Sequence, residues 1–131
     1  MEYVVPIELQ LLREGHVILD IYTDPLDVKD ITKNIPRHNE IMDRSTHLIH
    51  SITDATGLTK LPTNFLSGST KSLKIVHPMA GINVVVTNNH FLNSIAAMII
   101  KLVPQNNIKI FGTMNAGWAE IDRILVEEAT R

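Results

Sequence analysis

The stretch that decides the fold spans residues 47–54 and reads His-Leu-Ile-His-Ser-Ile-Thr-Asp, an apolar strand that ends in an acid. A short loop over residues 55–62 follows, and Thr63 and Asn64 then open an expected helix. In α/β domains, this order brings polar side chains and helix amides to the carboxyl edge of a sheet. The stretch therefore predicts an α/β fold and locates a candidate site at the strand ends.

Comparable strand patterns occur on both sides of this stretch. Apolar runs rich in β-branched residues predict strands over residues 5–12, 16–23, 47–53, 82–87 and 108–111. The turn at Gly15 has hairpin length, so the first two strands are expected to be antiparallel. The later strands alternate with helices, which is typical of parallel pairing through right-handed crossovers.

Capping residues and prolines predict the helices. We expect a helix in two pieces from Asp24 to Ser45, broken at Pro36 because proline lacks a backbone donor. Further helices are expected over residues 63–77, over residues 90–103, and after a cap at Thr113 or Asn115. The order ββαβαβαβα predicts one domain over residues 1–131, with a five-stranded, mostly parallel mixed sheet, an antiparallel N-terminal strand and about four helices.

Composition restricts the functional classes. The 131 residues are 44% apolar and 5% aromatic, carry a net charge of −2 and include no cysteine. No basic cluster or aromatic platform suggests a nucleic-acid partner, and disulfides and cysteine-ligated metals are excluded. Residues 1–8 lack the pattern of a secretory signal, and the longest apolar run is too short to cross a membrane. We therefore expect a cytoplasmic protein without a transmembrane segment.

The strand ends provide the candidate site. Unsatisfied amides at helix starts favour anions, so we expect a ligand or anion crevice formed by Asp54, Thr63, Asn64, Asn88, Asn89 and Thr113. A simpler interpretation is that the hydroxyl and amide side chains only cap helices. For Asp54, the simpler interpretation is a turn in which its carboxylate accepts from the amides of Thr56 and Gly57.

Signatures of catalysis, cofactors and metals are missing from the sequence. None of the six histidines forms a pair at i, i+4 in a helix or i, i+2 in a strand, the spacings that place two imidazoles on one face. The sequence also lacks nucleophile-elbow, zinc-protease, Walker and dinucleotide-binding motifs. We expect no metal, no cofactor and no catalytic residue, although an enzyme that uses Asp54 in the crevice stays an alternative.

The element order, the chain length and the segment Leu48-Ile-His-Ser-Ile-Thr-Asp-Ala-Thr-Gly-Leu58 resemble the SpoIIAA-like family, relatives of the STAS anti-sigma-factor antagonists. The resemblance implies that Asp54 is the strand-end acid and Thr63 a possible phosphoacceptor for a partner kinase. The sequence departs from the STAS motif at Pro62, where a second Asp is usual, and at Asn64-Phe65, where Gly-Leu is usual.

The segment from Phe91 to Val103 has apolar residues around most of its circumference, whereas a surface helix normally keeps a polar face. Part of this helix should therefore be covered by something other than its own sheet. A homodimer is the commonest symmetric assembly. We expect the interface or the adjoining core to contain Ile95, Met98, Ile99, Ile100, Leu102 and Val103.

Three functional hypotheses follow from these observations. The first is a non-catalytic regulatory or protein-interaction domain of SpoIIAA-like type that self-associates through the apolar helix. The second is a carrier of a small apolar ligand or lipid, because the SpoIIAA-like fold is similar to that of CRAL-TRIO lipid-transfer domains. The third is an enzyme that uses Asp54. A cavity beneath the apolar helix would favour the carrier, and a flat exposed patch would favour assembly.

Overall fold

A computed structural model describes residues 6–61, 65 and 75–131. Within these residues, five strands form one sheet with neighbours in chain order. The strands are β1 (Ile7–Leu12), β2 (Val17–Thr23), β3 (Ile49–Gly57), β4 (Ala80–Val86) and β5 (Ile108–Phe111). The β1–β2 pair is antiparallel and the other three pairs are parallel. The predicted α/β class and mixed sheet are therefore confirmed.

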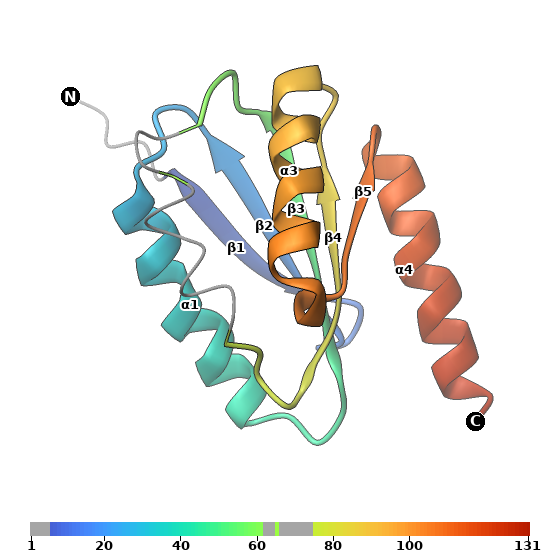
Figure 1. Cartoon of the computed structure of the whole chain (residues 1–131). Helices are drawn as coiled ribbons and strands as arrows, with labels where there is room; N and C mark the ends of the chain where they lie inside the picture. Colours follow the sequence, from blue (N-terminus) through green and yellow to red (C-terminus); the bar gives the residue numbers. More distant parts are fainter. Residues whose placement is uncertain (1–5, 62–64, 66–74) are drawn as a thin grey trace.

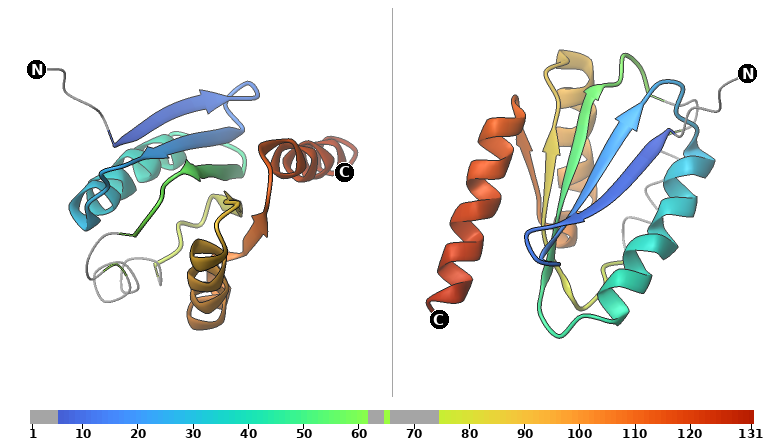
Figure 2. Two further views of the ribbon diagram at one scale, coloured as in Figure 1. Left: turned by 90° about the horizontal axis from the view of Figure 1, so that it is seen from above. Right: turned by 180° about the vertical axis from the view of Figure 1, so that it is seen from behind.

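The helices cover the two faces of the sheet. The described chain contains α1 (Val28–Asp43), α3 (His90–Leu102), α4 (Met114–Ala129) and the short 3-10 turn η1 (Pro104–Asn106). Figure 1 shows α1 and α3 in front of the sheet, and the views in Figure 2 place α4 on the opposite face. Strands that follow one another in the same direction with right-handed crossovers place their connecting helices on one face, which explains this arrangement. None of the described helices has the length and apolarity needed to cross a membrane.

The prediction of a broken helix after Asp24 was wrong. Helix α1 is continuous through Pro36, and its cap is Asp27, which forms a capping box with Asp30. The ring of Pro36 is exposed, so the carbonyl oxygen that loses its amide partner lies on the solvent side of the helix. The carboxylate of Asp24 instead accepts hydrogen bonds from the backbone amide and hydroxyl of Thr59.

The third strand is longer than expected. It continues past Asp54 to Gly57, because β2 offers further pairing partners up to Thr23, after a register shift between Ile21 and Thr23. Asp54 is thus inside β3 rather than at its end. The expected helix over residues 63–77 falls mostly outside the described residues, and residues 75–77 are not helical.

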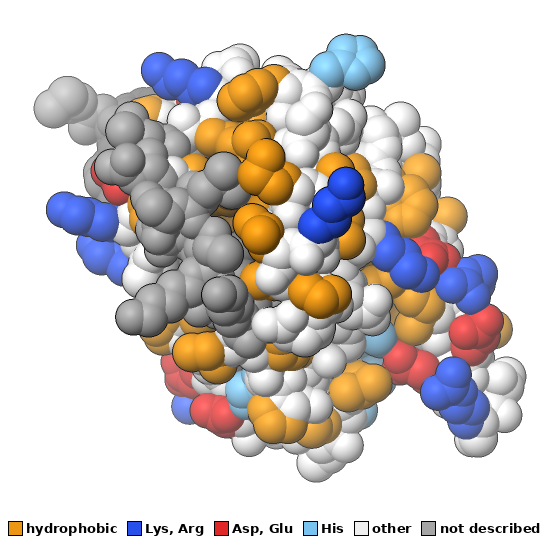
Figure 3. Space-filling model, viewed as in Figure 1, with side chains coloured by type: hydrophobic (Ala, Val, Ile, Leu, Met, Phe, Trp, Pro, Cys, Tyr) orange, Lys and Arg blue, Asp and Glu red, His pale blue; other side chains and the backbone are white. Residues whose placement is uncertain are grey.

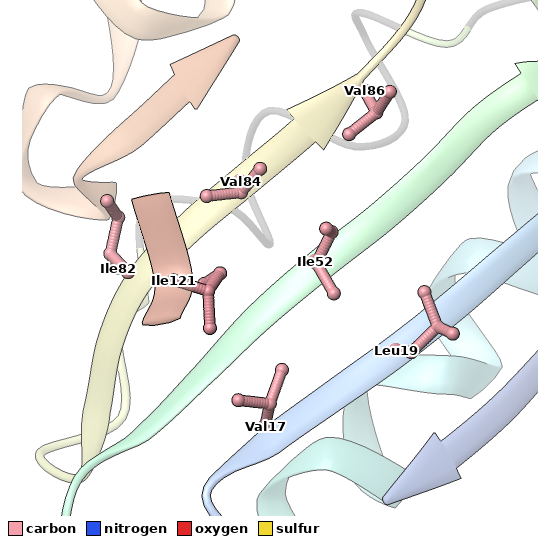
Figure 4. Close-up of a cluster of buried hydrophobic side chains, with 7 residues drawn as sticks. All are labelled: Val17, Leu19, Ile52, Ile82, Val84, Val86 and Ile121. Atoms are coloured by element: carbon pink, nitrogen blue, oxygen red, sulfur yellow. The ribbon is translucent and has the colours of Figure 1, made fainter. Parts of the chain in front are cut away.

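The largest core cluster lies between the sheet and α4. Its buried members come from three central strands and one helix position: Val17, Leu19, Ile52, Ile82, Val84, Val86 and Ile121 (Figure 4). Trp118, Ile124 and Leu125 of α4 are partly buried and pack against it. On the other face, α1 covers a smaller cluster of Ile18, Met42 and Ile49. Between α1 and α3, the same face carries polar side chains.

Candidate functional site

Three of the strand-end residues predicted from the sequence, Asp54, Asn88 and Thr113, lie at the same edge of the sheet. Asp54 pairs in register with Val86, and Val86 pairs with Phe111, so Asp54 is level with the ends of β4 and β5, while β3 continues beyond it to Gly57. Asn88 and Thr113 each follow two residues after these positions. Thr63 and Asn64 lie outside the described residues.

Three of these side chains already have hydrogen-bond partners close by in the chain. Asn89 Oδ1 accepts from the amides of Phe91 and Leu92 at the start of α3. Thr113 Oγ1 accepts from the amide of Ala116 at the start of α4. Asp54 Oδ1 accepts from the amide of Thr56 at 3.0 Å, as expected for a turn, and its second donor is the Thr56 hydroxyl at 2.6 Å rather than the expected amide of Gly57. Anion binding at this edge stays a prediction.

A row of polar side chains, which the sequence patterns did not predict, lies on the face that carries α1 and α3. Asp20 in β2 is in register with Thr53 in β3, and Ser51 in β3 is in register with Asn83 in β4. Tyr22 lies two residues beyond Asp20, and successive side chains of a strand alternate between faces, so it belongs to the same face. Three adjacent strands therefore present polar groups at the centre of a covered sheet face, where apolar residues are usual.

These side chains line a cavity of about 160 Å³, called here the polar cavity. Helix α1 contributes Asn34 and His38, one helical turn apart, to the opposite wall. Asn34 is buried and accepts a hydrogen bond from Arg37. Asn83 donates to Asn106 at 3.2 Å. A cavity with this many hydrogen-bonding groups can hold water or the polar part of a ligand.

Asp20 and His38 form the centre of the polar cavity. His38 Nε2 lies 2.6 Å from Asp20 Oδ2, and the side chains are 18% and 3% exposed. Because a carboxylate oxygen accepts, we assign the proton to Nε2. The other oxygen, Asp20 Oδ1, is buried and receives no hydrogen bond from the described residues. A buried acceptor without a donor lowers the free energy of unfolding by about 1–3 kcal/mol, and by more when it is charged. We therefore expect Asp20 to destabilise the fold.

The environment of Tyr22 in this cavity keeps its phenol neutral. Burial raises the pKa of the Tyr22 phenol, and the nearby Asp20 carboxylate raises it further. Both effects disfavour the phenolate. Tyr22 therefore contributes a neutral hydroxyl, able to donate or accept one hydrogen bond, to the boundary of the polar cavity.

A second cavity of about 140 Å³ lies beneath α3 and is called here the apolar cavity. Its walls include Ala55 and Leu58 after Thr53, Val85 in β4, and the α3 residues Leu92, Ile95 and Ile99. Tyr22, Ile31, Thr53 and Asn83 line both cavities, so the two adjoin on the same sheet face. Asp54 is absent from the described lining of either one.

The predicted interface residues on α3 differ in burial: some face the interior of the fold and others face outward. Ile99 and Val103 are buried in the fold, and Ile95 lines the apolar cavity. Ile100 is half-buried. Met98 and Leu102 are exposed together with Phe91, and this set is called here the α3 outer stripe. Figure 3 shows hydrophobic side chains gathered over α3.

A sequence signal for the polar cavity does exist. Asp20 is the single charged residue in Val-Ile-Leu-Asp-Ile-Tyr-Thr, and its alternation with Ile18 directs it toward the same face. His38 follows the buried Asn34 by one turn. Asp20 and His38 come into contact because α1 crosses over β2. The spacing of residues along the chain does not predict that crossing.

Among the residues that the structure describes, no group of three His, Cys, Asp or Glu side chains is placed to hold a metal ion. Comparison with protein-family models, with curated proteins and with solved structures finds no match for this chain. Its function is therefore argued from the geometry of the two cavities.

Proposed function

We propose that this protein binds a small amphipathic molecule between α1 and α3, without transforming it. The observation that supports this proposal is the contact between two cavities of about 160 Å³ and 140 Å³, of which the first carries more polar side chains in its lining than the second. An engineered apolar cavity of about 150 Å³ binds benzene, so the apolar cavity suits a group of about that size. The polar cavity would then hold the hydrogen-bonding part. This is the carrier hypothesis, with a ligand smaller than a lipid.

The relationship to SpoIIAA-like domains is part of the proposal. The resemblance leads us to expect a mostly parallel mixed sheet with an antiparallel N-terminal strand, and a sheet of this kind supports the proposed relationship. Phosphorylation of Thr63 stays a proposal on a residue outside the described part. A regulatory role is compatible with ligand binding, because a ligand that orders the face between α1 and α3 would change what a partner contacts.

The ligand proposal predicts the effect of filling the apolar cavity. Ala96 is buried and lines it, so Ala96→Leu should place three further carbon atoms in the space that a ligand would use. We expect the affinity for toluene to fall at least about tenfold, which corresponds to about 1.4 kcal/mol. Toluene binding is measured by titration while the methyl NMR signals of Leu92 and Ile95 are followed.

The matched control is Ala97→Leu, the same change at the next position, which is exposed. This variant should bind toluene as the unmodified protein does. If saturating toluene leaves the Leu92 and Ile95 methyl signals of the unmodified protein in place, the apolar cavity is not a binding site and the proposal is wrong.

We also propose self-association through the α3 outer stripe, as a second function. Phe91 is 60% exposed, Leu102 50% and Met98 44%, and exposed apolar residues grouped on one helix are typical of interaction sites. A second copy of this chain is the simplest partner, because in a two-fold dimer the α3 outer stripe of one protomer would contact the same stripe of the other. The apolar area would then be covered without a second protein.

Self-association predicts a dimer that charge should disrupt. At about 50 µM, a contact of micromolar affinity is largely formed, so sedimentation equilibrium should give twice the monomer mass. The double change Met98→Asp and Leu102→Asp should shift the protein to monomer with an unchanged far-UV circular dichroism spectrum. Val126→Asp on α4, where the side chain is 64% exposed, is the control and should leave the mass unchanged. A monomeric unmodified protein would contradict the proposal.

A further inference from the structure

The polar cavity has acceptor atoms without donors. Asp20 Oδ1 receives no hydrogen bond from the described residues, although the side chain is only 3% exposed. With the imidazole proton on Nε2, His38 Nδ1 carries a lone pair, and no described residue donates to it. Asp20 Oδ1 is thus a buried acceptor without a donor among the described residues, whereas His38 Nδ1 lies on a partly exposed ring that solvent can reach. A ligand that donates a hydrogen bond would satisfy Asp20 Oδ1.

The described residues that line the two cavities include an acidic side chain but no lysine or arginine. Among the described residues that line the polar and apolar cavities there is no Lys, Arg or Glu, and Asp20 is the single Asp. The cation nearest along α1, Arg37, is bonded to Asn34. A carboxylate in a low-dielectric site attracts a positive ligand group more strongly than one in water does.

We propose that the Asp20–His38 pair selects a primary ammonium group, so that the ligand is a small amine with an apolar portion of about the size of a benzene ring. This inference rests on the proposed function and names the class of molecule. An ammonium group has three donors and no acceptor, which complements Asp20 Oδ1 and the hydroxyls of Ser51 and Thr53 that line the same cavity, while His38 Nε2 holds the other carboxylate oxygen. A carboxylate in the same place would lie beside the negative charge of Asp20 and be rejected.

The cavity is compatible with a compact head group of this kind. Asp20 lies in the middle of β2 at the level of Thr53, and Thr53 lines both cavities. A ring in the apolar cavity would therefore have its substituent directed along the shared wall of Tyr22 and Thr53 toward Asp20. A small rotation of the buried carboxylate would bring Oδ1 to the ligand.

The experiment compares three probes that each contain one benzene ring: benzylamine, toluene and benzoate. Each probe is titrated into the full chain near neutral pH, and binding is followed by NMR. Benzylamine should bind at least about tenfold more tightly than toluene, and benzoate more weakly than toluene. Asp20→Asn should reduce the affinity for benzylamine to that for toluene and leave toluene binding unchanged. Asp122→Asn, the same change at an exposed position on α4, should have no effect on any probe.

The outcomes separate this inference from the proposed function. If toluene binds but benzylamine binds no more tightly, or if Asp20→Asn keeps the preference for benzylamine, ammonium recognition is wrong and the apolar site stands. If neither toluene nor benzylamine binds, both are wrong. The three probes on the unmodified protein give a decision even where Asp20→Asn fails to fold.

Discussion

Replacing Gly81 with alanine is expected to destabilise the protein by about 3 kcal/mol, at the upper end for overpacking. A Cβ atom at position 81 would overlap the imidazole of His50, which is 2% exposed. The ring cannot move aside easily, because Nδ1 accepts from the amide of Ile82 at 2.9 Å and Nε2 donates to Glu128 at 2.6 Å. Any shift therefore breaks hydrogen bonds that hold β4 and α4. Denaturant unfolding measures the loss.

Two further variants make this result specific. Gly112→Ala adds the same methyl group where nothing lies within 4 Å, so its free energy of unfolding should stay within about 0.5 kcal/mol of the parent. In a His50→Ala background, Gly81→Ala should cost much less, with a coupling energy of about 1–3 kcal/mol in the double-mutant cycle. Additive effects of the two changes would contradict the steric explanation.

Truncation of Ile121 to alanine is expected to cost about 2–5 kcal/mol of unfolding free energy. Ile121 is fully buried and is the α4 residue at the centre of the core cluster with Ile52 and Val84. The change removes three carbon atoms and leaves a cavity between helix and sheet, which adds to the lost transfer free energy. Domains of this kind are stable by about 5–15 kcal/mol, so the variant should unfold at a clearly lower denaturant concentration.

Val126 on the same helix provides the control for Ile121. Its side chain is 64% exposed, so Val126→Ala should change the free energy of unfolding by no more than about 0.5 kcal/mol. Comparable losses for Ile121→Ala and Val126→Ala would show that α4 is not held by the described core cluster.

Local patterns in the chain were sufficient for most of the fold. The apolar run over residues 82–87 and the cap at Thr113 predicted a strand and a helix where the structure has β4 and α4. The errors occurred where a tertiary contact competed with a local signal. Pro36 does not break α1, because its missing hydrogen bond lies on the solvent side. β3 continues past Asp54, because β2 supplies further pairing partners.

The amino-acid sequence by itself determined the α/β fold class, because hydrophobic periodicity, helix caps and turns depend on a few neighbouring residues and can be recognised along the chain. It also placed Asp54, Asn88 and Thr113 at one edge, since parallel strands align their ends. The pairing of Asp20 with His38, and the position of the polar cavity beside the apolar one, were decided only by the tertiary structure. These contacts depend on how α1 crosses β2 and how α3 covers β4, and such long-range geometry is set by packing rather than by spacing along the chain.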